Sequence, residues 1–172
     1  MLHESDKIKQ LDITESTLTF SEIYNKPYFP KELDEDIKKS NLLLLPHEGF
    51  RDFEKPVFPE QTMEFFNYVK AFDNENFHSE ICISDDDYYE LELHSALITI
   101  PTLILDKVVL PLAISIIASY ALELKQKRKK DVKIKVNMTV VDGEKSKNLS
   151  YEGDSENLNE TLKAANDEFF NS

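Results

Sequence analysis

The sequence predicts an α+β fold, and two patterns carry that prediction. Several short runs alternate apolar and polar residues with the period of a strand, and longer runs between them have helical spacing. The chain of 172 residues is 41% hydrophobic and contains 11 Phe and 7 Tyr, so it can bury a substantial core. We expect a small βαβ-type N-terminal half, a central apolar helix, and a C-terminal β-hairpin followed by a helix.

Composition divides the chain into an N-terminal arm, residues 1–40, and a single α+β domain, residues 41–172. The first residues of the arm are charged and have no apolar core, so no export signal is indicated and we expect a cytoplasmic protein. Two short helices are predicted in the arm, at Phe20–Tyr24 and Lys31–Ser40, because two prolines interrupt the segment between them.

Residues 41–95 form an acidic βαββ part in this interpretation. The run Leu42–Leu45 is typical of a strand that is buried on both faces. An amphipathic helix is predicted over Gln61–Phe72, and a second strand over Phe77–Ser84. Alternation of apolar with polar residues predicts a third strand over Tyr89–Leu93, with His94 on its polar side. The segment from 42 to 84 therefore reads as one βαβ unit.

Residues 96–130 form an apolar helical segment with a basic end. The uncharged runs Ser95–Leu105 and Val108–Leu122 are separated only by Asp106 and Lys107. A helix that is apolar nearly all round belongs in a protein core or in a membrane. The longest uncharged run has 15 residues, whereas a membrane span needs about 20. We therefore favour a core helix, with burial against another chain as one variant and membrane insertion of residues 96–123 as the alternative.

Residues 131–172 predict a ββα unit. Apolar residues alternate regularly from Ile134 to Val140, and Asp142-Gly143 is a strong turn signal, with the connection expected to run through Lys147. Ser155 is expected to cap a final helix. The apolar face predicted for that helix consists of Leu158, Leu162, Ala165 and Phe169.

The net charge of −13 is unevenly distributed. Residues 41–95 hold 13 acidic and 3 basic residues, whereas residues 96–130 hold 2 acidic and 6 basic residues. The acidity argues against a protein that tracks nucleic-acid phosphates, although an acidic inhibitor that mimics nucleic acid stays open as an alternative. The polarity favours charge pairing between faces or an oriented contact with a partner.

The candidate chemical residues do not assemble into a catalytic or metal-binding motif. The chain has one cysteine, Cys82, and its four histidines show no ligand spacing, so neither a zinc site nor any cofactor is expected. Asp85, Asp86 and Asp87 match no calcium loop and read as a solvated turn. Three glycines do not suffice for a phosphate-binding loop. We therefore expect no enzyme activity.

Two stretches carry a resemblance to a known group of proteins. They are VVLPLAISIIASYALELKQ, from Val108, and the hairpin VKIKVNMTVVDGEKSKNLSYEG, which ends in Tyr151-Glu152-Gly153 and precedes Leu158–Leu162. This part of the chain, residues 108–169, resembles the effector-associated accessory modules of bacterial conflict and anti-phage defence systems. The resemblance implies a non-enzymatic partner or sensor component of a bacterial defence operon.

The function expected from these observations is that of an accessory subunit that binds and regulates or scaffolds a partner protein, such as an effector or sensor chain. A homo-oligomer is a further possibility, and direct binding of nucleic acid is not expected. Aromatic residues and arginine commonly anchor protein interfaces. The contact residues predicted on this basis are Phe50, Arg51, Phe53 and Phe58 in an aromatic loop, and Ile114, Ile117 and Tyr120 on exposed parts of the apolar helix.

Overall fold

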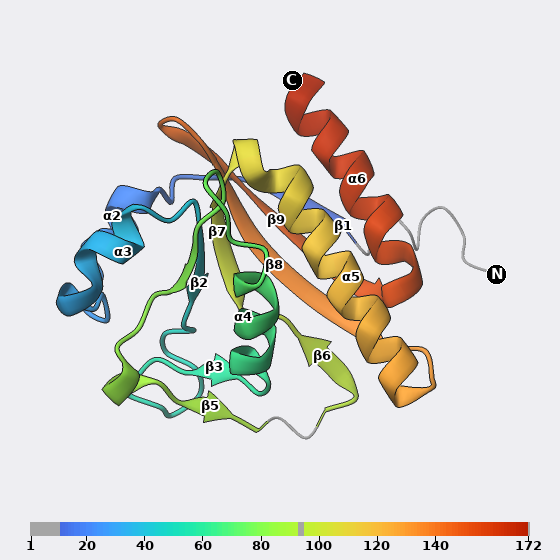
Figure 1. Ribbon diagram of the computed structural model, residues 1–172, viewed down its shortest axis with the longest axis horizontal. Coiled ribbons are helices and arrows are strands. Elements are labelled where there is room, and N and C mark those ends of the chain that lie inside the picture. The colour runs from blue at the N-terminus through green and yellow to red at the C-terminus, as the bar shows by residue number, and fades with distance from the viewer. Residues whose placement is uncertain (1–10, 93–94, 172) are drawn as a thin grey trace.

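The computed structural model describes residues 11–92 and 95–171, with the side chains of residues 169–171 left out. It confirms the α+β fold. The main sheet is mixed and its strands follow the order β1-β9-β8-β7-β2-β4, with β6 also paired to β8 (Figure 1). The predicted position of Phe169 on the last helix lies outside the described side chains, and Leu93 and His94 lie outside the described residues.

The predicted βαβ unit is present. Strand β2 (Leu42–Leu45) runs parallel to β4 (Ser79–Ile81), and helix α4 (Thr62–Lys70) lies between them in the chain. All four residues of β2 are buried, as expected of a strand covered on both faces. Lys70 at the end of α4 binds the carboxylates of Asp73 and Glu80 at 3.0 and 2.8 Å and so ties the helix to β4.

The apolar segment 96–130 is only partly helical, so the prediction of one helical segment is wrong in its first third. Residues Leu97–Thr99 form strand β6 and residues Thr102–Asp106 form strand β7, both parallel to β8 (Lys133–Asp142). The run is rich in β-branched residues, and a fully buried strand cannot be told from a buried helix by periodicity alone. Pro101 lies between the two strands, where no pairing is lost to its missing N–H.

Helix α5 (Leu110–Arg128) follows a short 3₁₀ turn (Lys107–Val109) and crosses the sheet between the parallel strands β7 and β8. The Asp106 side chain accepts a hydrogen bond from the Val108 N–H at 3.0 Å, which caps the start of the turn. Lys129 ends the helix in the left-handed conformation, with φ 55°. By length and composition Lys107–Arg128 could cross a membrane, yet half of its most apolar window is buried inside the fold.

The C-terminal ββα unit is present with a tighter turn than predicted. Strands β8 and β9 (Lys145–Asp154) pair antiparallel up to Asp142 and Lys145, so only Gly143 and Glu144 connect them rather than a loop that runs to Lys147. Gly143 has φ 66°, which a glycine adopts at no steric cost. Helix α6 (Ser155–Asn171) buries Leu158, Leu162 and Ala165, three of the four residues predicted for its apolar face.

The N-terminal arm contributes a strand as well as helices. Strand β1 (Leu11–Ser16) pairs antiparallel with β9 and forms one edge of the sheet, which was not predicted. Its alternation of Leu11 and Ile13 with polar residues is the signal that could have revealed it. The short helices follow as α2 (Phe20–Tyr24), the 3₁₀ turn Lys31–Leu33 and α3 (Asp34–Lys38), which together cover the region predicted as helical.

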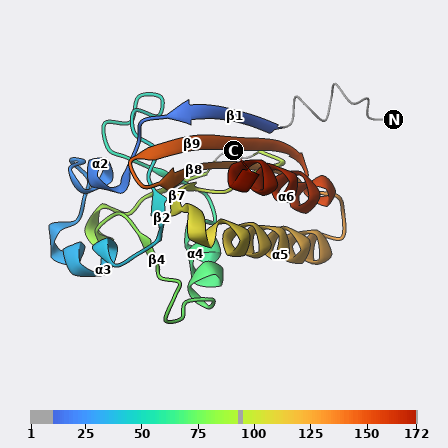
Figure 2. The same cartoon turned by 90° about the horizontal axis from the view of Figure 1, so that it is seen from above.

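Two hydrophobic cores lie on opposite faces of the sheet. Helices α4, α5 and α6 cover one face, and α2 and α3 cover part of the other (Figure 2). Cys82 lies in the smaller core beside Leu43 and Ile104, and burial raises the pKa of its thiol to about 12.

Ile114 on α5 is expected to be a core residue rather than a contact residue. Replacing Ile114 by Ala should lower the free energy of unfolding by about 2–5 kcal/mol, because the cavity is left inside the larger core. Urea unfolding followed by circular dichroism measures the loss. Leu122→Ala on the same helix is the control, because Leu122 is 55% exposed and should change stability by less than about 1 kcal/mol. Equal losses in the two variants would contradict the burial of α5 described here.

Cys82 is expected to resist alkylation in the folded protein. The thiolate is the reactive form, and a thiol that is fully buried with a pKa of about 12 is almost entirely protonated near neutral pH. Iodoacetamide at about pH 8 should therefore react at least about 100-fold more slowly with the native protein than with the protein in guanidinium chloride. Mass spectrometry follows the modification, and equal rates in the two states would contradict the placement of Cys82.

Candidate functional site

The aromatic loop, residues 47–57, is a closed hairpin-like excursion between β2 and β3 (Phe58–Pro59). The His47 N–H donates to the Val57 carbonyl at 2.7 Å, and the Val57 N–H donates to the His47 carbonyl at 3.0 Å. At its tip, Gly49 and Arg51 both adopt positive φ angles, 65° and 52°. The bridge at its base holds the loop as a defined structure rather than a free connection.

Aromatic contacts order the tip of this loop. The rings of His47 and Phe50 meet edge to face with centroids 5.4 Å apart, and the Arg51 guanidinium lies 5.0 Å from the centre of the Phe50 ring. Arg51 is exposed and Phe50 is half-buried. A cation over an aromatic face is stabilising, by about 0.5–1 kcal/mol at an exposed site.

Tyr89 from a distant part of the chain joins the aromatic loop at the surface. The Phe53 and Tyr89 rings lie with centroids 6.2 Å apart, and the two side chains are 38% and 52% exposed. Tyr89 precedes strand β5 (Glu90–Leu91), which pairs with β3 in a small separate sheet at the lower edge of Figure 1. Two exposed aromatic rings in contact are a feature that recurs at protein interfaces.

Glu90 fixes the segment that carries Tyr89. Its carboxylate accepts the Gln61 N–H at 2.7 Å and the Met63 N–H at 3.3 Å, at the start of helix α4. The Tyr88 hydroxyl donates to the same carboxylate at 2.5 Å, and burial together with the charge of Glu90 raises the pKa of Tyr88. A carboxylate at a helix N-terminus is favourable because the free N–H groups there carry positive potential. Glu90 therefore holds the acidic segment, residues 84–92, against the body of the protein.

Two hollows flank the aromatic loop. One, of about 70 Å³, is mainly apolar, and its lining consists of His47, Phe50, Val57, Phe58, Pro59, Leu91 and Thr99. The other is a groove of about 380 Å³, whose lining consists of Pro27, Tyr28, Glu48, Gly49, Glu54, Lys55, Pro56, Ile83 and Asp87. His47 and Val57 line the first hollow, whereas their neighbours Glu48 and Pro56 line the second, so the loop forms a wall between them.

The segment that carries Tyr89 is acidic. Residues 84–92 contain five carboxylates and no basic residue, and the Asp85–Asp87 triplet forms an exposed 3₁₀ turn. Asp85 and Asp86 have no basic partner among the described residues. We call the area formed by Phe50, Phe53, Tyr89 and these carboxylates the aromatic–acidic surface.

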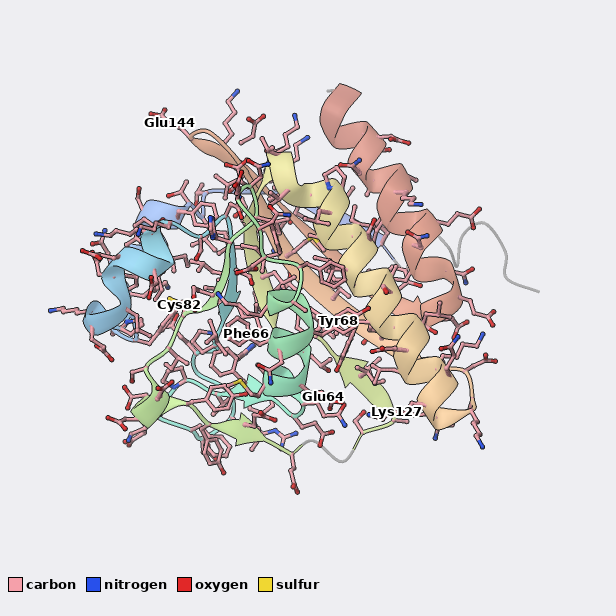
Figure 3. All side chains as sticks on the ribbon, in the orientation of Figure 1. Glu64, Phe66, Tyr68, Cys82, Lys127 and Glu144 are labelled. Carbon is pink, nitrogen blue, oxygen red and sulfur yellow. The ribbon has the colours of Figure 1, made fainter. Side chains whose placement is uncertain are left out.

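The basic end of α5 is partly neutralised within the chain. Lys125 binds Asp131 and Glu156, and Lys127 lies 3.5 Å from Glu64 in the first turn of α4 (Figure 3). The pair Lys127–Glu64 joins residues 96–130 to the acidic part, residues 41–95, which is one of the two outcomes that the charge polarity predicts. Asp85 and Asp86 of the aromatic–acidic surface thus have no basic partner among the described residues, whereas Lys125 and Lys127 of the basic run form ion pairs.

The structure places only part of the predicted contact set at the surface. Phe50, Arg51 and Phe53 lie together on the aromatic loop, as predicted. Phe58 is 1% exposed and stacks on Tyr88 with ring centroids 5.2 Å apart, so it packs in the core at the base of the loop rather than at the surface. The predicted exposure of Ile114, Ile117 and Tyr120 is wrong, because all three face the sheet or α4 and are buried in the larger core.

Sequence reasoning missed Tyr89 as a surface residue. The alternation from Tyr89 to Leu93 placed Tyr89 on the same face as Leu91, with Glu90 opposite. In the structure the strand is only two residues long, and Tyr89 lies before it, with its ring against Phe53. The one signal in the sequence was the position of this tyrosine directly after an acidic run.

The aromatic–acidic surface combines features that protein interfaces use. Across residues 11–92 and 95–171, no three His, Cys, Asp or Glu side chains are grouped so that they could hold a metal ion. Cys82 is fully buried and is enclosed by the smaller core. The arrangement offers aromatic area, an apolar hollow and negative charge.

Comparison with family models, with curated proteins and with solved structures gives no significant match for this chain.

Removing the Glu90 carboxylate is expected to release the acidic segment. Glu90→Ala should lower the free energy of unfolding by about 1–2 kcal/mol, because two N–H groups at the start of α4 lose their acceptor. Urea unfolding measures this loss, and hydrogen exchange should become faster in residues 84–92. Asp86→Ala removes an exposed carboxylate of the same segment and should leave both quantities unchanged. If the two variants behave alike, Glu90 does not hold this segment.

Proposed function

We propose that this chain is a non-enzymatic accessory subunit that binds a partner protein through the aromatic–acidic surface. The observation that carries the proposal is the exposed contact between Phe53 and Tyr89, two rings from segments far apart in the chain. The fold keeps this contact at the surface by the bridge at the base of the loop and by the Glu90 carboxylate. A pre-ordered surface loses little conformational entropy when a partner binds.

The biological setting belongs to the same proposal. Residues 108–169 resemble accessory modules of bacterial anti-phage defence, so we place the chain in the bacterial cytoplasm beside an effector or sensor protein that it regulates or scaffolds. This setting is supported by the resemblance and by the soluble-type packing of α5 within the fold. No cofactor enters the proposal.

A membrane-disrupting role for residues 96–123 is the competing proposal. The length and apolar composition of Lys107–Arg128 favour it. Against it, α5 connects two neighbouring parallel strands and contributes eight buried residues to the core, so its insertion into lipid would take the sheet apart. An acidic inhibitor that occupies a basic groove would use the same surface as the accessory subunit, and the two differ in the identity of the partner.

The partner-binding proposal predicts that two aromatic truncations abolish capture of a partner. Affinity-tagged wild-type protein expressed in its native host should recover a partner that Phe53→Ala/Tyr89→Ala recovers at least about tenfold less, because aromatic anchors each contribute more than about 1 kcal/mol. Quantitative mass spectrometry measures the recovery.

Val108→Ala and Leu122→Ala are the controls, because both residues are exposed and apolar but lie on or before α5. They should recover the partner as the wild type does. Equal recovery by the Phe53→Ala/Tyr89→Ala variant would refute the proposed surface, and recovery of the protein only in the membrane fraction would favour the competing role of α5.

A further inference from the structure

We infer that the aromatic–acidic surface binds a basic segment of the partner protein that also carries an apolar anchor. The inference rests on the proposed function and adds the chemistry of the partner to it. In this arrangement an apolar side chain enters the hollow beside Phe50, and a lysine or arginine side chain enters the groove that Glu54 and Asp87 line.

The apolar hollow selects one small side chain. Its volume of about 70 Å³ is far below the roughly 300–1,000 Å³ of a ligand pocket and suits a single aliphatic side chain. Phe50, Val57 and Leu91 provide most of its wall, and transfer of an aliphatic side chain from water into such a site is favourable. An apolar anchor in a pocket is the usual centre of a protein interface.

The groove on the other side of the loop selects a long basic side chain. Tyr28, Pro56 and Ile83 give it apolar walls along which the methylene stem of a lysine or arginine can lie. Glu48, Glu54 and Asp87 add three carboxylates against one lysine of the lining, Lys55, and Glu48 already binds Lys26 at 3.1 Å. Glu54 and Asp87 have no basic partner within the described part of the chain, so they are the groups left to meet an incoming cation.

The charge of the groove disfavours an acidic occupant. The carboxylates of Glu48, Glu54 and Asp87 line it against one cation, Lys55, and Asp85 and Asp86 directly precede Asp87 in the chain, so an anionic segment or a nucleic acid would meet net repulsion there. A second copy of this chain is also disfavoured, since each copy has a net charge of −13. Its own basic run is partly used in ion pairs, in which Lys125 binds Glu156 and Lys127 binds Glu64.

A designed peptide tests this chemistry directly. The probe is a fluorescent twelve-residue peptide of alternating leucine and lysine, and its controls replace every lysine by glutamate or every leucine by serine. Fluorescence anisotropy should show that the wild-type protein binds the probe at least about tenfold more tightly than either control peptide. Binding should weaken between about 50 mM and about 300 mM salt, because surface charge attraction is screened.

Charge reversal at the groove should remove this binding. Glu54→Lys/Asp87→Lys should weaken binding of the probe at least about tenfold, whereas Glu144→Lys/Glu160→Lys, with the same change in net charge, should leave it within about twofold. Glu144 lies at the tip of the β8–β9 hairpin, far from β5 (Figure 3), and Glu160 is an exposed residue of α6. Circular dichroism checks that both variants are folded, and the salt dependence of the wild type gives an answer without either variant.

Absence of binding, equal binding of the three peptides, or equal losses in the two charge variants would each overturn the inference. A dimer of the wild-type protein would also overturn it if the Glu54→Lys/Asp87→Lys substitutions dissociated that dimer. The occupant of the surface would then be a second copy of the chain.

If the probe fails while Phe53→Ala/Tyr89→Ala still loses its partner from cells, the basic-segment inference is wrong and the proposed function stands. If the probe binds but that variant retains every partner, the proposed function fails instead.

Discussion

Burial of α5 against the sheet is the constraint on which the rest of the structure depends. The helix crosses from β7 to its parallel neighbour β8, and its residues Ile114, Ile117 and Tyr120 complete the larger core. Parallel neighbours need such a crossover, and an apolar helix over the sheet supplies it without exposing the backbone of either strand to lipid or water. Because α5 is used in this way, its apolar composition is explained by the fold, and the contact surface proposed above lies on the aromatic loop instead.

The aromatic–acidic surface illustrates how the contacts of one carboxylate position residues that face the solvent. Glu90 satisfies N–H groups at the start of α4 and receives the Tyr88 hydroxyl, so the residue between them, Tyr89, is held facing outward beside Phe53. Phe58 stacks on Tyr88 from below. The same few contacts thus stabilise the small β3–β5 sheet and present the aromatic pair.

Some of the unevenly distributed charges of the sequence form ion pairs within the fold, and others stay exposed. Some opposite charges pair within the chain: Lys127 lies 3.5 Å from Glu64, and Lys125 binds Glu156. Five further carboxylates lie in residues 84–92, and in the proposed function they favour a basic partner segment. Exposed carboxylates contribute little to stability, and in the proposed function their charge attracts a basic segment of the partner.

The sequence by itself determined the fold class, the βαβ unit from 42 to 84, the C-terminal ββα unit and the membership of Phe50, Arg51 and Phe53 in one exposed loop. These features depend on local periodicity and turn residues, which neighbouring positions in the chain encode. Only the tertiary structure decided that residues 97–106 are central strands, that β1 joins the sheet, and that Tyr89 meets Phe53 while Ile114 and Tyr120 are buried. The physical reason is that strand pairing and burial depend on contacts between segments far apart in the chain. The composition of an apolar run does not indicate which segment will cover it.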